Sequence, residues 1–296
     1  MKNGMLAALA AYTLWGILPV YWKTIEQVPA GEILAHRVVW SVVVVVGLLS
    51  AQKRWGWLNK VARKPAILIP FVGSALLLTA NWFIYLWANN NEHIVEVSLG
   101  YFINPLVNVL LGVLLLRERM RPWQWVSIGL AFAGVAYLTI SYGRLPWIAV
   151  SLALTFAFYG LIRKTAPLGS IEGLTIETSL MFLPALAFLI FLGANGTGAF
   201  GQGDVQTTLL LAFAGLATAI PLMLFAHGAR NVPLSTLGVL QYVAPTLQFL
   251  VGVVIYREGF SGAQLVGFSM IWTALLLYWL EGILTRRRQA QALSPG

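Results

Sequence analysis

The stretch PLVNVLLGVLLLRERMRPWQWV, residues 105–126, has a second copy in the same chain, because residues 245–266 read PTLQFLVGVVIYREGFSGAQLV. Apolar matches alone would carry little weight, since both stretches draw on few residue types. Turn-forming, charged and amide residues also coincide at one constant spacing of 140, in the pairs Pro105/Pro245, Gly112/Gly252, Arg117/Arg257, Glu118/Glu258 and Gln124/Gln264. Glu32 and Glu172 extend the register backwards. These matches indicate an internal repeat.

Composition indicates a membrane protein. The chain has 296 residues, of which 59% are hydrophobic and 10% charged, and its mean hydropathy is +0.79. Soluble domains carry about 25% charged residues, so we expect an integral membrane protein surrounded by lipid. The net charge of +9 would suit nucleic acid, but Lys and Arg fall in short loops and form no basic stripe. We therefore expect no nucleic-acid partner.

The beginning of the chain allows two interpretations. In MKNGMLAALA a basic residue precedes an apolar run with a small-residue motif, as in a cleaved signal peptide. The apolar run continues through Trp15 and Pro19, however, and many further apolar runs follow. We therefore favour a first membrane span. The chain has no cysteine, which excludes disulfides and Cys-based metal sites.

Ten segments reach or approach the length of about 20 apolar residues that a membrane-spanning helix requires. They are residues 4–22, 33–51, 66–88, 95–116, 123–141, 146–162, 173–192, 207–227, 234–256 and 262–281. The repeat divides the chain into a first five-helix repeat at 1–144, a second at 145–285 and a basic tail at 286–296. Because five is odd, the two copies must cross the membrane in opposite directions. We expect an all-α integral membrane protein with ten transmembrane helices in two inverted five-helix repeats, a recurring construction in secondary transporters.

Positive charge predicts the orientation, because Lys and Arg concentrate in cytoplasmic loops. The N-terminus and every second loop hold fifteen of the nineteen Lys and Arg, whereas the other side holds three, Lys23, Arg144 and Arg257. This distribution predicts that both termini are cytoplasmic. Of the nineteen, Arg37 alone lies inside an expected span.

Several motifs resemble a known family. The chain is similar to EamA-domain members of the drug/metabolite transporter superfamily, and more closely to the RarD group of bacterial inner-membrane proteins. The resemblance covers almost the whole chain and rests on YTLWGILPVYWK (12–23), VPAGEILAHRVVWS (28–41), NWFIYLWANNN (81–91), SLGYFINPLVNVLLG (98–112), AFYGLIRK (157–164) and STLGVLQYVAPTLQFL (235–250). It implies a permease in the bacterial inner membrane that exports or facilitates the passage of small metabolites.

The matched prolines of the fourth and ninth spans mark a candidate substrate site. Pro105 and Pro245 cannot donate a hydrogen bond to the carbonyl four residues earlier, and a freed carbonyl is tolerated in a membrane only against protein or a watery cavity. Aromatic and amide residues surround them: Tyr101, Asn104, Asn108, Gln241, Tyr242 and Gln248. Such residues could line a substrate cavity, or they could join helices by hydrogen bonds. Both interpretations stay open for each residue.

Other spans add further candidates. Asn81 and Tyr85 share one face of the third span, and Trp82 is adjacent. Trp15 and Tyr159 precede matched glycines in the first and sixth spans and are weaker candidates. Arg37 and Glu177 occupy matched repeat positions, which first suggests an ion pair. Because the repeat is inverted, most of the membrane should separate them, with Arg37 at the outer mouth and Glu177 at the inner one. Arg37 could instead reach the outer interface, and Glu177 is a candidate for proton coupling or gating.

The sequence thus favours a permease or exporter of small amphipathic metabolites, for which amino acids and drug-like compounds are candidates, working by alternating access of its two halves. A channel-like facilitator and a non-transporting scaffold or regulator are the alternatives. No nucleophile and base set, no metal-ligand spacing and no phosphate-binding loop is present. We therefore expect no enzyme activity, no cofactor and no metal.

Overall fold

The computed structural model of the chain describes residues 2–91, 93–143, 145–202, 204–257 and 261–293, without the side chains of 89–90, 94–95 and 286–293. In these ranges the secondary structure is entirely helical, and ten helical segments are long and apolar enough to cross a membrane. The ten predicted spans are therefore confirmed. Arg144 and Glu258, used above for the charge count and the repeat, lie outside the described residues.

The helices follow one another with short connections. They are α1 (Lys2–Lys23), α2 (Ala30–Ala51), α3 (Trp57–Arg63), the 3-10 turn η1 (Pro65–Leu68), α4 (Ile69–Asn90), α5 (Ile94–Leu114), α6 (Pro122–Tyr142), α7 (Trp147–Thr165), α8 (Ser170–Ala194), α9 (Val205–Asn231), α10 (Leu234–Gln241), α11 (Val243–Leu250), the π-turn η2 (Val251–Ile255) and α12 (Gly262–Leu293). The tail expected at 286–296 continues α12 as far as Leu293.

The ninth span is broken, whereas the fourth is continuous. Pro105 lies inside α5 without interrupting it, but the chain turns at Tyr242, between α10 and α11 and three residues before Pro245. The break falls next to the Gln241 carbonyl, which Pro245 leaves without its usual donor. Below the break, α10 lies so close to α5 that a Cβ on Gly238 would collide with the carbonyl oxygen of Pro105.

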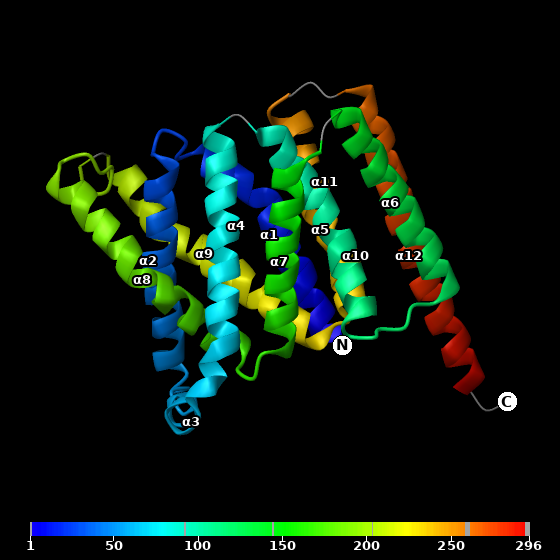
Figure 1. Ribbon diagram of the computed structural model, residues 1–296, viewed down its shortest axis with the longest axis horizontal. Coiled ribbons are helices and arrows are strands. Elements are labelled where there is room, and N and C mark those ends of the chain that lie inside the picture. The colour runs from blue at the N-terminus through cyan, green and yellow to red at the C-terminus, as the bar shows by residue number, and fades with distance from the viewer. Residues whose placement is uncertain (1, 92, 144, 203, 258–260, 294–296) are drawn as a thin grey trace.

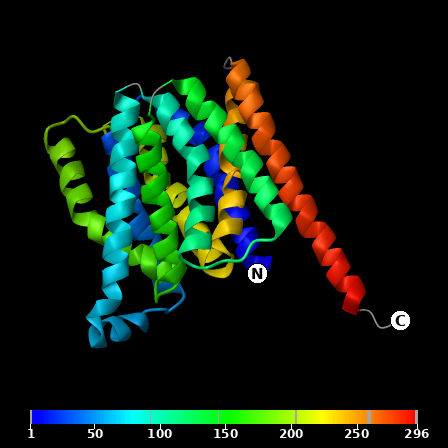
Figure 2. The same cartoon turned by 45° about the vertical axis from the view of Figure 1, so that its right-hand side comes forward.

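Most of the helices meet in the centre of the molecule. Side chains from α1, α2, α4, α5, α7, α8, α9, α10 and α11 form one buried cluster that includes Tyr12, Leu111, Ala157, Phe225 and Leu237. Figures 1 and 2 show α6 running along α12 at one flank, where a second buried cluster joins them. In Figure 1, α8 lies at the opposite flank, next to α2. The central helices are thus the ones that can enclose a site.

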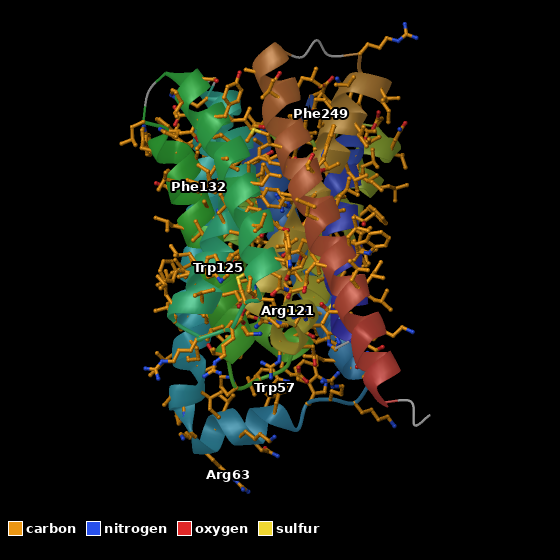
Figure 3. The ribbon with its side chains drawn as sticks, turned by 90° about the vertical axis from the view of Figure 1, so that its right-hand side faces the viewer. Trp57, Arg63, Arg121, Trp125, Phe132 and Phe249 are labelled. Atoms are coloured by element: carbon orange, nitrogen blue, oxygen red, sulfur yellow. The ribbon has the colours of Figure 1, made fainter. Side chains whose placement is uncertain are left out.

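Both chain ends lie at the same end of the molecule (Figure 1), which we call the termini end. Figure 3 shows α3, with Trp57 and Arg63, at this same end, while Phe249 lies toward the opposite end. An even number of spans brings the two termini to one side, as the charge distribution also predicted.

Matched residues of the repeat adopt matched local structure. Arg117 and Arg257 both have left-handed backbones, with φ of 53° and 54°. Seven residues after each, Gln124 and Gln264 accept a hydrogen bond from the backbone N–H three residues earlier, at 2.9 Å and 2.8 Å. Each copy therefore ends one span with a left-handed residue and begins the next with the same amide cap.

Close contact between α2 and α9 depends on Gly215. A Cβ at this position would overlap the backbone carbonyl carbon of Trp40 and lie 2.7 Å from its oxygen, and the Ser41 hydroxyl donates to the Gly215 carbonyl at 3.2 Å. We expect Gly215→Ala to destabilise the protein by about 1–3 kcal/mol, because packed helices would have to separate. Thermal unfolding in detergent measures this loss.

Gly47, on α2, is the matched control. A Cβ there would meet no atom within 4 Å, so Gly47→Ala should leave the melting temperature unchanged or raise it through helix propensity, by about 1 kcal/mol at most. Equal melting temperatures for the two variants would contradict the close packing of α2 on α9.

Candidate substrate-binding site

A cavity of about 330 Å³ lies among the central helices, and its walls come from α1, α2, α4, α5, α7, α9, α10 and α11. Eight of the eleven predicted substrate-binding residues line it: Arg37, Asn81, Trp82, Tyr85, Tyr101, Asn104, Gln241 and Gln248. It extends to Trp22 and Ala30, at the ends of α1 and α2 that lie away from the termini end. Its volume is near the lower limit of typical small-molecule sites, which suits one small metabolite.

Arg37 projects from α2 into this cavity. Its Nε donates to the Thr218 hydroxyl of α9 at 3.0 Å, and its Cζ lies 5.0 Å from the Trp22 ring and 4.8 Å from the Trp82 ring. The two rings offer cation–π attraction but accept no strong hydrogen bonds. Arg37 is thus held on the cavity wall by one hydrogen bond and two aromatic faces.

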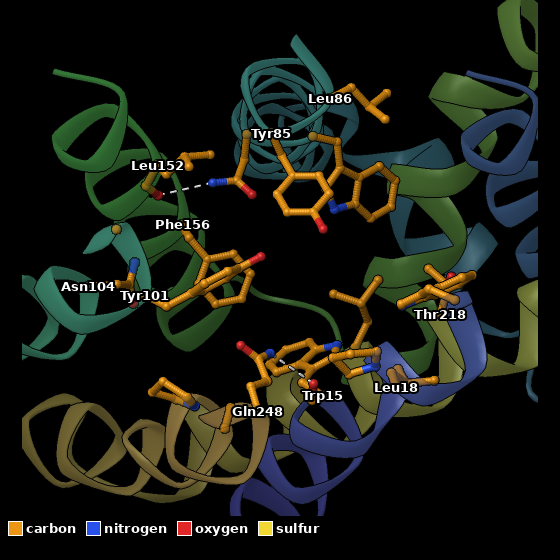
Figure 4. A pocket seen from close by; sticks show the side chains of 18 of the residues that line it. Trp15, Leu18, Tyr85, Leu86, Tyr101, Asn104, Leu152, Phe156, Thr218 and Gln248 are labelled. Carbon is orange, nitrogen blue, oxygen red and sulfur yellow. Dashed lines mark hydrogen bonds between the residues drawn. The ribbon is translucent and has the colours of Figure 1, made fainter. Parts of the chain in front are cut away.

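Two side-chain amides have a fixed direction because backbone carbonyls take their N–H groups. Asn81 Nδ2 donates to the Leu152 carbonyl at 3.0 Å and to the Thr155 hydroxyl at 2.9 Å, and Gln248 Nε2 donates to the Trp15 carbonyl at 3.1 Å. A carbonyl can only accept, so each amide must turn its NH₂ group toward it. Figure 4 shows the Gln248 oxygen facing the cavity on the other side of this bond.

Aromatic side chains supply most of the remaining wall. Figure 4 shows the hydroxyls of Tyr85 and Tyr101 pointing into the cavity, with Phe156 near Tyr101 and Trp15 beside Gln248. Trp15 was a weaker candidate in the sequence, whereas Phe156 and Thr218 were missed. The signal for Thr218 was faint, since a lone threonine in an apolar span more often bonds to its own helix.

A row of hydrogen-bonded side-chain amides forms part of the cavity wall. Asn104 Nδ2 donates to the Ala153 carbonyl of α7 at 2.7 Å, and Asn108 Nδ2 donates to Asn104 Oδ1 at 3.1 Å and to Gln241 Oε1 at 2.8 Å. This network joins α5 to α7 and α10. Asn104 and Gln241 reach the cavity, but Asn108 is completely buried behind them and lies off its lining.

Three further candidates lie away from the cavity. Tyr242 is buried and donates to the Phe102 carbonyl at 3.3 Å, so it joins α10 to α5. The Tyr159 hydroxyl donates to Glu177 Oε2 at 3.4 Å, and both residues are buried. Glu177 also accepts a hydrogen bond from Ser74. Tyr242, Tyr159 and Glu177 thus lie between packed helices, off the lining of the cavity.

Arg163 is one of the charged residues that the sequence analysis misplaced. It was assigned to a cytoplasmic loop, but α7 continues to Thr165 and Arg163 is only 1% exposed. Its NH1 lies 3.4 Å from Glu177 Oε1, and its NH2 donates to the Ser170 carbonyl at 2.8 Å. The expectation that Arg37 alone lies inside a span is therefore wrong. The acid of the seventh span was the available signal, since a buried carboxylate requires a partner.

Glu118 joins the two halves at the termini end. It follows α5, and its carboxylate accepts hydrogen bonds from the backbone N–H groups of Leu234 and Ser235, at 2.6 Å and 2.9 Å, and from the Ser235 hydroxyl at 2.7 Å. These N–H groups begin α10 and have no partner within the helix, and the helix dipole favours a negative charge there. Glu118 thus holds α10 against α5 at the termini end, opposite the end of the cavity near Trp22 and Ala30, which we call the cavity mouth.

Comparison with known proteins gives the family. The family model of EamA-like transporters matches residues 2–140. Protein RarD of Streptomyces exfoliatus is 47% identical over 292 residues, which cover 99% of this chain and 93% of that protein. Protein RarD of Escherichia coli is 43% identical and covers 98% of each chain. The chain belongs to the RarD group of the EamA-like transporter family. The uncharacterized transporter YojE of Bacillus subtilis, 43% identical over 97% of this chain and 96% of its own, is another relative.

A solved crystal structure shows the same fold. It superposes on this RarD-group chain with a TM-score of 0.68 and covers 94% of this chain and 97% of the other, at 21% identity. The resemblance found in the sequence is therefore confirmed for the family and the helical fold. The protein is a multi-pass membrane transporter and not an enzyme.

The pair Arg163 and Glu177 generates a stability prediction for this transporter. Removing one partner leaves an uncompensated buried charge, so Arg163→Gln should destabilise it by about 3–5 kcal/mol. Glu177→Gln leaves Arg163 unpaired and should be comparably destabilising. The double variant Arg163→Gln/Glu177→Gln should be more stable than Arg163→Gln alone. Thermal unfolding of purified protein measures all three, and additive losses in the double variant would contradict the pairing.

Proposed function

We propose that this RarD-group transporter moves small amphipathic metabolites across the bacterial inner membrane, as an exporter or permease, by alternating access between inverted halves at 1–144 and 145–285. The observation that carries the proposal is the cavity itself, whose wall combines aromatic rings and amides from helices of both halves. Aromatic faces suit an apolar body, and amides suit polar ends. Amino acids and drug-like compounds are candidate substrates.

The cavity mouth at one end of the molecule and the Glu118 contact at the other support one conformational state of an alternating-access cycle. With both termini and the tail at 286–296 cytoplasmic, as the positive charges predict, the cavity mouth lies on the periplasmic side. The contact of Glu118 with α10 then lies on the cytoplasmic side and keeps α5 and α10 together. With this orientation we infer a state that is open outward and closed inward.

Transport is tested with purified protein in liposomes and a panel of labelled amphipathic metabolites. We expect flux above empty vesicles for some members of the panel, and a flux at least about tenfold lower for Arg37→Gln, because Arg37 supplies the charge in the cavity. Lys23→Gln removes a positive charge outside the cavity and is the matched control. Absence of flux for the whole panel would favour a scaffold or regulator over a transporter with these substrates.

Glu177 stays a candidate for proton coupling, although its buried carboxylate already has an ion-pair partner in Arg163 and a hydrogen-bond donor in Ser74. In the same liposomes, a coupling role predicts that an inward or outward proton gradient changes the wild-type flux and that Glu177→Gln removes this dependence. Flux that ignores the gradient in both proteins would leave Glu177 with a packing role only.

The role of Glu118 can be tested because the chain has no cysteine of its own. Glu118→Gln replaces charge-assisted hydrogen bonds with neutral ones and should favour opening on the cytoplasmic side. A single cysteine at Leu111, which is buried on α5, should then react faster with a membrane-impermeant thiol reagent added from that side. A cysteine at Leu86, on the cavity wall, should react more slowly from the periplasmic side.

Glu26→Gln is the control, because Glu26 is an exposed carboxylate beyond α1 with no part in the cavity. It should leave both labelling rates unchanged. Equal rates in the wild type and Glu118→Gln, at both cysteines, would remove Glu118 from the conformational equilibrium.

A further inference from the structure

The cavity is unbalanced in charge. Among the described residues that line it, Arg37 alone carries a formal charge, and no Asp or Glu is present. A guanidinium taken out of bulk water is unfavourable unless an anion pairs with it. The nearby tyrosine hydroxyls and amide groups are neutral and cannot supply that charge. The residues that line the cavity therefore supply no negative charge to pair with Arg37.

The N–H donors of the Arg37 guanidinium show where a negatively charged group would bind. A guanidinium has five N–H donors, and Nε uses one of them on Thr218. Within the described part of the chain the two terminal amino groups have no hydrogen-bond partner, and no carboxylate lies within ion-pair distance. Because Trp22 and Trp82 flank the guanidinium, both rings limit its movement. The terminal amino groups remain available as a planar fork, which matches a carboxylate with two parallel hydrogen bonds.

We propose that the substrates are monocarboxylates, bound through their carboxylate by Arg37. This inference rests on the proposed transport function and names the substrate class of the same site. One guanidinium balances one negative charge, so a phosphate dianion would keep a charge without a partner in a water-poor cavity. An amine without a carboxylate would place its positive charge beside Arg37 with no acid to compensate it.

The rest of the cavity defines the rest of the substrate. Trp15, Phe156 and Trp82 contribute apolar rings to the cavity wall, and Trp15 packs edge to face on Phe156 with ring centroids 5.7 Å apart, so a planar apolar body would pack against this aromatic wall. The Gln248 oxygen faces the cavity (Figure 4), and Asn81, whose NH₂ group donates to α7, also lines the cavity and has its oxygen free of those bonds. Both oxygens are acceptors. The far end of the substrate is therefore a hydrogen-bond donor such as an N–H or O–H group.

Three probes that share one planar body separate the charge states. They are indole-3-acetate, indole-3-acetamide and tryptamine, which carry a negative, neutral and positive end group and the same ring N–H donor. Binding is measured in detergent by the ligand-dependent rise in melting temperature. In the wild type we expect indole-3-acetate to bind at least about tenfold more tightly than the amide, and tryptamine more weakly than either.

Arg37→Gln tests the assigned contact. Indole-3-acetate should fall to the affinity of the amide, whereas the amide should bind as in the wild type, which also shows that the variant is folded. Lys23→Gln should preserve the wild-type ranking and so controls for long-range charge. Equal binding of acetate and amide by the wild type, tighter binding of tryptamine, or no binding of any probe at millimolar concentration would each overturn the proposal, whether or not Arg37→Gln folds.

Liposome flux of the same probes separates this inference from the proposed function. Charge-selective binding without flux of any probe would support the site and contradict transport of these compounds. Flux of all three at equal rates would support transport and contradict the monocarboxylate class.

Discussion

The hydrocarbon core of a bilayer has no water for polar groups, so each amide, hydroxyl and charge placed there must find its partner within the protein. The line from the Ala153 carbonyl through Asn104 and Asn108 to Gln241 shows how this chain meets the constraint for its N–H donors, whereas Asn108 Oδ1 is buried without a hydrogen-bond partner among the described residues. Three side chains join three helices, and each N–H group named in the line donates to an oxygen. The amide network therefore positions α5, α7 and α10 around the cavity and also forms part of its wall.

The same constraint distinguishes two of the arginines that lie inside spans, Arg163 and Arg37. Arg163 is almost fully buried, lies 3.4 Å from Glu177 and donates to a backbone carbonyl, so its charge is compensated by the protein. Arg37 has Thr218 and two tryptophan rings, none of which carries a charge. Placing a cation inside a span without a charged partner costs several kcal/mol, so the position of Arg37 requires an explanation. Arg37 lines the cavity, and the anionic substrate that we propose would supply the missing negative charge there.

Sequence patterns predicted the features that depend on local chemistry. Ten apolar runs gave the spans, and the spacing of 140 linked Arg117 to Arg257 and Gln124 to Gln264, whose backbones and caps agree in the structure. What the patterns could not provide were contacts between distant segments. A shift of three residues in the end of α7 decided whether Arg163 was a loop residue or a buried one. The direction of the Gln248 amide likewise depends on a carbonyl 233 residues away in the chain.

Repeat mates occupy different environments around the cavity, and this difference bears on how it would work. Asn108 is buried in the amide network, whereas its mate at a spacing of 140, Gln248, turns an oxygen to the cavity. The mates Tyr101 and Gln241 both line the cavity, and Gln241 also accepts a hydrogen bond from Asn108. Alternating access in an inverted repeat requires such a difference, because each half must adopt in one state the arrangement that the other half has in the second state. On this argument we propose that opening toward the termini end would bring Asn108 to the cavity and bury Gln248, which would place both amides on one transport path.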